Sequence, residues 1–228
     1  PRGPATLRAV GVTRALGGLA PLAGLAREVC GIVDGEVQGM DPGEASCAAG
    51  GRGRGAVPGA AWLNDRFTAD RLAQVAGDGR ADRRDLMHVG THFVLRPGNM
   101  TRSWLLLGDG QRLHLDELAR LDFAGQDLVT LSACETGLGG GDERASGQEV
   151  DGLNTLVVRR GASAVLASLW RVEDASTSTL MVALYRELAK QVDPAVALGR
   201  AQAAVRAAGG ALAHPFYWAG FYLASGGS

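Results

Sequence analysis

The chain has 228 residues, 46% of them hydrophobic, so it is long enough to bury one sizeable core, and we interpret it as a single domain spanning residues 1–228. Its 23 basic and 24 acidic side chains give a net charge of −1, which removes any electrostatic case for general binding to nucleic acid or to a membrane surface. No apolar run approaches the roughly 20 residues of a membrane span, and the first residues lack the apolar core of a signal peptide. Because the chain starts with Pro1 rather than Met, we expect it to be a piece of a longer protein.

The three cysteines, Cys30, Cys47 and Cys134, stand at wide and unpatterned spacing. An odd number of cysteines at such spacing argues against a disulfide framework and against a zinc cluster. We therefore expect a reducing, cytoplasmic setting and no metal site.

The N-terminal third contains one short strand and two helices by its pattern. Arg8–Val12 predicts an edge strand, and Pro21–Val33 has helical apolar spacing that places Cys30 on the core face. Gly35–Gly59 is rich in glycine and small residues and predicts a flexible loop; its GGRGRG run follows no visible strand, which argues against a nucleotide-binding turn. Thr68 is placed to cap the helix TADRLAQVA.

The middle of the chain leads into the stretch DLVTLSACETGLGGG. Asp85–His92 predicts a strand, Ser103–Leu107 a short strand, and Leu115–Leu121 a short helix. Leu128–Leu131 is a β-branched, apolar run of the kind that fills a strand buried on both faces. Gly137–Gly147 predicts a polar, glycine-rich mobile loop, because its glycines and charged residues have little apolar surface to bury.

The C-terminal part alternates helices and strands. The expected elements are two strands, 162–170 and 217–223, and three helices, 148–159, 177–189 and 194–208. Strands that alternate with helices of 10 to 15 residues predict an α/β fold with a mostly parallel central sheet and helices on both faces.

Two residues at predicted strand ends combine into a candidate nucleophile and base. Cys134 follows the buried strand and precedes glycines, and His92 ends its own strand 42 residues earlier. His88 shares a face with His92 but lies roughly 13 Å back along the strand, so we expect it to be buried and hydrogen-bonded. A histidine ~50 residues before a small-small-Cys sequence is the caspase arrangement, although spacing alone leaves open a buried inert cysteine and an unrelated histidine.

Three longer segments carry a resemblance to a known family: SACETG at 132–137, GASAVLASLWRVED at 161–174 and HPFYWAGFYL at 214–223. They closely resemble the CHAT domain, a caspase-like module often found after tetratricopeptide repeats, and the resemblance covers nearly the whole chain. It implies a caspase-haemoglobinase-like sandwich related to separase, with His92 as catalytic histidine and Cys134 as nucleophile. The implied activity is that of a cysteine endopeptidase without metal or cofactor, a regulated protease of bacterial signalling or defence. Because the loop 137–147 falls where processed caspases are divided into two subunits, the resemblance also makes this loop a candidate point of regulation beside the active site, with self-cleavage after Arg144.

The partners implied by this resemblance are a protein or peptide substrate and an upstream repeat domain, sensor domain or activating partner. Direct contact with nucleic acid or membrane is not expected. Two rival interpretations stay open: a catalytically silent caspase-like scaffold, and another acyl hydrolase on a doubly wound sheet. The second lacks a G-x-S-x-G elbow around Ser132, and the first is at odds with an intact His92 and Cys134.

The residues around the dyad show one departure from the family pattern. Many relatives have Gly directly after the histidine, where a backbone N–H helps to form the oxyanion hole, and here Phe93 stands in that place. The N–H survives the change, so the oxyanion hole is assigned to the backbone of Phe93 and Cys134. A bulkier residue there would alter the local backbone or narrow the site.

The segment LWRVED, residues 169–174, resembles the LW-x-V-x-D stretch of separase, whose last aspartate lines the pocket for a basic P1 side chain. That aspartate corresponds to Asp174, and we group Glu173 and Trp170 with it as substrate-binding residues. A carboxylate in a partly buried pocket pairs well with an arginine fork. The alternative, that Glu173 or Asp174 only caps the following helix, stays open at this point.

Overall fold

The computed structural model describes residues 3–41, 43–44, 47, 51–80, 82–94, 96, 99, 101–132, 147–170 and 172–226, and at residues 147–151 and 174 the backbone alone. The expected loop at 137–147, with Arg144, therefore lies outside the described residues apart from the backbone of Gly147. Within the part of the chain described, no helix combines the length and apolarity needed to cross a bilayer.

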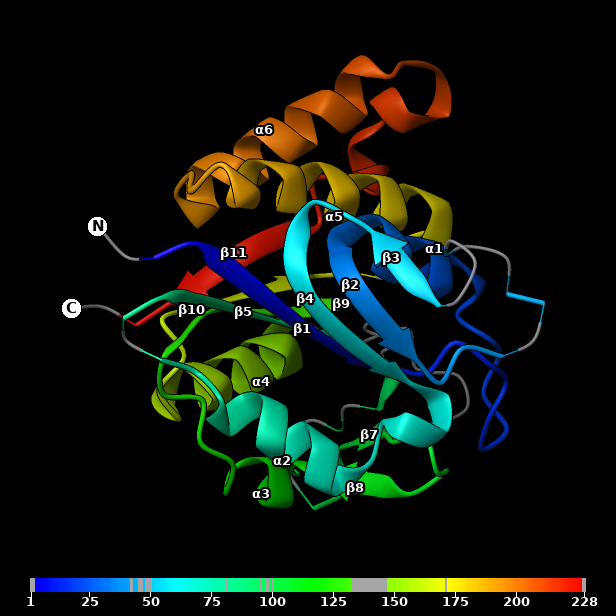
Figure 1. Ribbon diagram of the computed structural model, residues 1–228, viewed down its shortest axis with the longest axis vertical. Coiled ribbons are helices and arrows are strands. Elements are labelled where there is room, and N and C mark those ends of the chain that lie inside the picture. The colour runs from blue at the N-terminus through cyan, green and yellow to red at the C-terminus, as the bar shows by residue number, and fades with distance from the viewer. Residues whose placement is uncertain are drawn as a thin grey trace.

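A central sheet of eight described strands organises the molecule (Figure 1). In spatial order the strands are β11 (Phe221–Ser225), β10 (Ala164–Ser168), β9 (Gln126–Ser132), β5 (Arg84–Gly90), β1 (Ala5–Gly11), β4 (Val57–Leu63), β2 (Val33–Gln38) and β3 (Arg52–Arg54). The outermost pairs, β10 with β11 and β2 with β3, are antiparallel, and the pairs between them are parallel. The predicted mostly parallel α/β sheet is confirmed.

Helices cover both faces of this sheet, as Figure 1 shows. One face carries α1 (Ala23–Ile32), α5 (Asp174–Ala189) and α6 (Pro194–Ala207), and the other carries α2 (Ala69–Gly77), α3 (Leu115–Leu118) and α4 (Gly147–Arg159). Because successive side chains of a strand point to opposite faces, each central strand contributes side chains to two hydrophobic cores, one on each face of the sheet. Leu86, Leu128 and Leu166 pack toward α1, α5 and α6. Met87, Val129 and Val165 pack toward α2, α3 and α4.

The strongly periodic elements lie where the sequence predicts them. Thr68 caps α2, since its hydroxyl accepts a hydrogen bond from the Arg71 N–H at 3.2 Å. The helix expected at 177–189 begins three residues earlier, because Glu173 already occupies its N-cap position. The final strand, expected at 217–223, is shifted to β11 because Pro215–Tyr217 forms a 3₁₀ turn.

Two predictions for the N-terminal third are wrong. The strand at Arg8–Val12 is not an edge strand: β1 is central and pairs with β4 on one side and β5 on the other. The region 35–59 is not a loop, because it contains most of β2, all of β3 and the start of β4. Its glycines permit close strand approach, since a Cβ at Gly35 would lie 1.9 Å from the Gly59 carbonyl oxygen.

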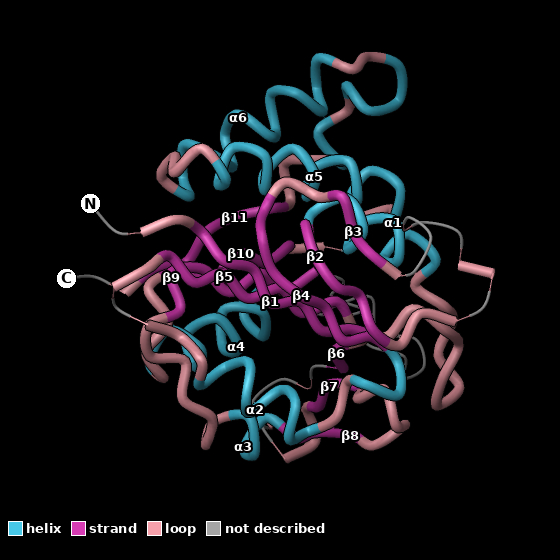
Figure 2. Tube along the Cα trace, in the orientation of Figure 1, coloured by secondary structure: helices cyan, strands magenta, loops and turns pink. Residues whose placement is uncertain are grey.

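A second sheet of three short described strands projects from the α2–α4 side (Figure 2). It consists of β6 (Phe93–Val94), β7 (Trp104–Leu106) and β8 (Arg112–His114), all antiparallel. The strand expected at Ser103–Leu107 is β7, and it belongs to this hairpin sheet rather than to the central one. Because β6 starts directly after His92, this small sheet begins at the end of a central strand.

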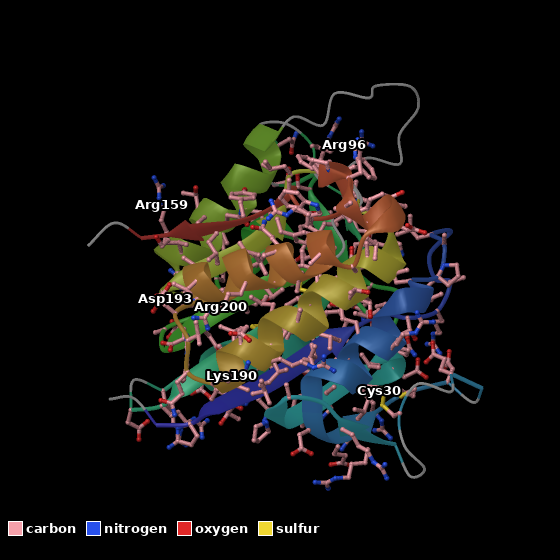
Figure 3. The ribbon with its side chains drawn as sticks, turned by 90° about the horizontal axis from the view of Figure 1, so that it is seen from above. Cys30, Arg96, Arg159, Lys190, Asp193 and Arg200 are labelled. Atoms are coloured by element: carbon pink, nitrogen blue, oxygen red, sulfur yellow. A yellow bond between two sulfur atoms is a disulfide. The ribbon has the colours of Figure 1, made fainter. Side chains whose placement is uncertain are left out.

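Cys30 and Cys47 form a disulfide, so the expectation that the cysteines are unpaired is wrong. Cys30 lies near the end of α1, and the chain returns after β2 so that the two Cα atoms stand 5.1 Å apart across a separation of 17 residues (Figure 3). Spacing in the sequence does not reveal this return. The cysteine count consequently gives no support for a reducing compartment.

Candidate active site

The carboxyl ends of β5 and β9 lie side by side at one edge of the central sheet. The two strands are parallel neighbours, and their register pairs Gly90 with Ser132. His92 follows Gly90 by two residues, and Cys134 follows Ser132 by two residues. The described ends of β5 and β9 therefore lie at the same level, at the edge where open parallel sheets place their chemistry, and His92 lies at that edge.

The His92 imidazole is held by a backbone carbonyl that precedes α1. Its Nε2 lies 2.8 Å from the Ala20 oxygen, and the side chain is buried. A carbonyl oxygen only accepts hydrogen bonds, so Nε2 carries the proton and Nδ1 is the ring nitrogen that can act as a base. This contact fixes both the tautomer and the ring orientation.

Cys134 lies outside the described residues, so its side chain has no described position. The disulfide nevertheless bears on its chemistry. The chain contains three cysteines, and Cys30 is bonded to Cys47. Cys134 is therefore the cysteine left without an intramolecular disulfide partner, as a nucleophilic thiol must be.

The comparison with protein families agrees with this geometry. The model of the CHAT domain matches residues 32–226, a range that contains His92 and Cys134. The chain belongs to the CHAT domain family. A search of curated proteins found no match. The mostly parallel sheet flanked by helices is consistent with a caspase-like fold, so the family and the fold inferred from sequence are both confirmed.

The backbone N–H and the side chain of Phe93 in this CHAT domain have different surroundings. The Leu106 N–H donates to the His92 oxygen at 3.0 Å, so Phe93 and Leu105 form the next, non-hydrogen-bonded pair of the antiparallel ladder. The Phe93 N–H consequently points away from β7, as a donor to an oxyanion must. The phenyl ring is buried in the core on the α2–α4 side of the sheet, in the same cluster as Met87. This core accommodates the bulk that was expected to narrow the site.

The expected substrate-binding residues follow β10, the strand that runs parallel to β9 on its other side. The Trp170 ring stacks on Phe216, with centroids 6.3 Å apart, and its Nε1–H donates to the Phe216 oxygen at 2.9 Å. With Leu169 and Phe216 both exposed, these residues form an apolar surface at the β10 end. Trp170 therefore lies at the same edge of the sheet as His92.

Glu173 and Asp174 lie at the start of α5. Glu173 is exposed and occupies the N-cap position, but its side chain makes no capping hydrogen bond, so capping by the Glu173 carboxylate is excluded. Asp174 is the first residue of α5, and its side chain is outside what the structure describes. The pocket role of Asp174 therefore stays a prediction.

Sequence reasoning missed the Ala20 carbonyl, because a backbone acceptor has no residue-type signal. It also passed over Glu28, which is buried within α1. Glu28 follows Leu25 by three residues and so falls on the apolar face of that helix. A charged residue on an apolar stripe was the signal that would have found it.

A cavity of about 620 Å³ lies at the opposite, amino-terminal edge of the sheet. Arg84 at the start of β5 and Asp127 near the start of β9 line it, together with Asp193 at the N-terminus of α6. The Arg84 guanidinium is already engaged, because it donates to the Val192 oxygen at 2.7 Å. This cavity is separated from His92 by the length of the strands, and we assign it no part in the chemistry.

Proposed function

We propose that this CHAT domain is a cysteine endopeptidase in which His92 activates Cys134. The observation that carries the proposal is the register of β5 and β9, which pairs Gly90 with Ser132, because His92 and Cys134 each follow one of these two residues by two positions in the sequence. The bond from His92 Nε2 to the Ala20 oxygen supports it, because it leaves Nδ1 as the base. An unpaired thiol at Cys134 completes the requirement for a nucleophile.

In the proposed reaction, His92 Nδ1 takes the thiol proton and the Cys134 thiolate attacks the scissile carbonyl carbon. The developing oxyanion accepts hydrogen bonds from the backbone N–H groups of Phe93 and Cys134. The proton on Nδ1 then passes to the leaving amine, and water hydrolyses the thioester. The Ala20 oxygen supports the imidazolium in each proton transfer, since it holds the Nε2–H throughout.

Specificity in this proposal comes from the segment after β10. We assign the pairing with an arginine or lysine at P1 to Asp174; the support for this is that β10, which precedes it, is the parallel neighbour of β9 and ends at the same edge. Glu173 is exposed beside it, and Trp170 offers an aromatic wall. The substrates are proteins or peptides, and an upstream domain or activating partner supplies regulation.

The test is cleavage of a diverse peptide library by the wild-type chain beside Cys134→Ala and His92→Ala. Both variants are expected to lose turnover while still folding, and His92→Ala should also have a lower thermal midpoint, because it removes a buried ring and its contact with the Ala20 oxygen. His114→Ala is the matched histidine control, since His114 only caps α3, and it should cleave like the wild type. Turnover that survives in Cys134→Ala or His92→Ala would refute the dyad.

A covalent label separates a protease from a scaffold with the same fold. A peptide with an arginine next to a cysteine-directed electrophile should modify Cys134 in the wild type and leave His92→Ala much less labelled. Labelling that does not depend on His92 would indicate an exposed but unactivated thiol and would favour the scaffold.

A further inference from the structure

Five polar side chains are buried together between the central sheet and helices α1 and α5. Each is at most 2% exposed, and each sits among residues of an otherwise apolar core. They are Glu28 of α1, His88 of β5, Thr130 and Ser132 of β9, and Tyr185 of α5. Buried polar groups persist only where they are hydrogen-bonded, so their contacts indicate why they are there.

The contacts form one continuous network centred on the Glu28 carboxylate. Ser132 Oγ donates to Glu28 Oε1 at 2.7 Å, and His88 Nε2 lies 2.9 Å from the same oxygen. On the other side of the ring, His88 Nδ1 lies 3.2 Å from the Tyr185 hydroxyl. That hydroxyl is 3.0 Å from Thr130 Oγ1.

The Glu28 carboxylate contacts one residue on each of two neighbouring strands. Glu28 Oε1 lies 2.9 Å from His88 Nε2 and accepts a hydrogen bond from Ser132 Oγ at 2.7 Å. Burial raises the pKa of Tyr185 far above its ordinary value, so its hydroxyl stays neutral and serves as a hydrogen-bonding link. One carboxylate on α1 thus binds β9 through Ser132 and β5 through His88.

This network lies directly behind the proposed dyad. Ser132 is two residues before Cys134 in the sequence, and His88 lies on β5, four residues before His92. The register reinforces the relation, since His88 pairs with Thr130 just as Gly90 pairs with Ser132. The segment that leads into α1 also supplies the Ala20 oxygen that holds His92.

We infer that Glu28 is a positioning residue for the dyad: by anchoring Ser132 and His88, it fixes the ends of β9 and β5 so that Cys134 and His92 meet in a reactive geometry. The inference rests on the proposed function. It assigns a catalytic consequence to a carboxylate that touches neither substrate nor the reacting atoms. Displacement of reacting groups by about 1 Å costs on the order of 100-fold in rate, so small shifts of these strand ends suffice.

The test compares Glu28→Gln and Ser132→Ala with the control Glu36→Gln. Glu36 is an exposed glutamate of β2, and its carboxylate only accepts from Gln38. Two quantities are measured on each folded variant: kcat and KM with a peptide substrate, and the rate at which iodoacetamide alkylates Cys134 between pH 5 and pH 10. The alkylation readout needs no proteolysis.

Glu28→Gln and Ser132→Ala are expected to lower kcat by about 10- to 100-fold with KM within about twofold. The midpoint of the alkylation profile should move up toward the ordinary cysteine pKa of about 8.5, because the thiol loses its alignment with His92. Ser132→Thr, which keeps the hydroxyl, should restore both quantities. Glu36→Gln should match the wild type in each.

Wild-type kcat and an unshifted alkylation profile in folded Glu28→Gln and Ser132→Ala would overturn the inference. A loss that follows only the unfolded fraction, judged by the thermal midpoint, would also overturn it. If Glu28→Gln does not fold, Ser132→Ala decides alone. A wild type that cleaves no peptide refutes the proposed function, and the alkylation profiles then decide the positioning role by themselves.

Discussion

Reduction of the Cys30–Cys47 disulfide is expected to lower the free energy of unfolding by about 3 kcal/mol. The bond closes a loop with a sequence separation of 17 residues. Chain-entropy arguments give such a loop a loss of roughly 10 cal/mol/K in the unfolded chain, or about 3 kcal/mol at 25 °C. Domains are commonly stable by only about 5–15 kcal/mol, so this is a large fraction of the total.

The assay is a urea titration of the wild-type chain with and without reductant. Cys30→Ala/Cys47→Ala is the control, because it should unfold at a midpoint that reductant does not move. Thiol titration of the unfolded, unreduced wild type should find one thiol, since two of the three cysteines are bonded to each other. Three titratable thiols, or midpoints that coincide with and without reductant, would refute the reasoning.

Two further predictions concern α5. Asp174→Ala should lower cleavage after arginine by roughly 10- to 150-fold, the worth of a charge-assisted bond of about 1.5 to 3 kcal/mol, and a peptide panel varied at P1 measures it. An equal loss for apolar P1 residues would indicate a helix role instead. Hydrogen bonds from Lys190 and Arg200, both labelled in Figure 3, lower the pKa of Glu187 in the folded protein. The contribution of Glu187 to stability is therefore present above the ordinary carboxyl pKa and is lost as the pH falls through the lowered pKa of the folded state. Urea midpoints of wild type and Glu187→Gln should converge on acidification; a constant difference would contradict this.

The elements that the sequence predicts well are those whose signal is local. The Thr68 cap, the Leu180–Leu188 stripe of α5 and the buried, leucine- and β-branched-rich centre of β9 each need only neighbouring residues to be recognised. Their boundaries moved by a few residues where a cap or a 3₁₀ turn intervened. Helix and strand identity therefore followed from periodicity, and the α/β class followed from their alternation.

The elements that were misjudged depend on contacts far along the chain. β1 is central because β4 pairs with it on one side and β5 on the other. The residues Arg8–Val12 alone do not indicate these pairings. The strands β2 and β3 each contain one glycine, Gly35 and Gly53, that permits close approach to the backbone of a neighbouring strand. Composition alone cannot distinguish such strands from a loop, because the partner that gives the glycines their purpose is not adjacent in sequence.

The site divides in the same way. The sequence nominates His92 because it is a titratable residue at a predicted strand end, and the structure adds the Ala20 oxygen beside its Nε2, while its catalytic role stays a prediction. The disulfide was not accessible, since the return of the chain toward α1 brings Cys47 to Cys30 across a strand. Glu28 was visible as a charge on an apolar face, but its meaning required the positions of Ser132 and His88.

The unit that performs the proposed chemistry is larger than the segment matched by the family model. That match begins at residue 32, whereas the Ala20 oxygen and the Glu28 carboxylate precede it. β1 precedes it as well, and its removal would leave β4 and β5 without the strand that joins them. In the proposed mechanism, the matched segment supplies His92 and Cys134, and the residues before it supply the Ala20 oxygen and the Glu28 carboxylate. Reactivity at Cys134 should therefore depend on residues 5–32 as much as on the strand that bears the cysteine.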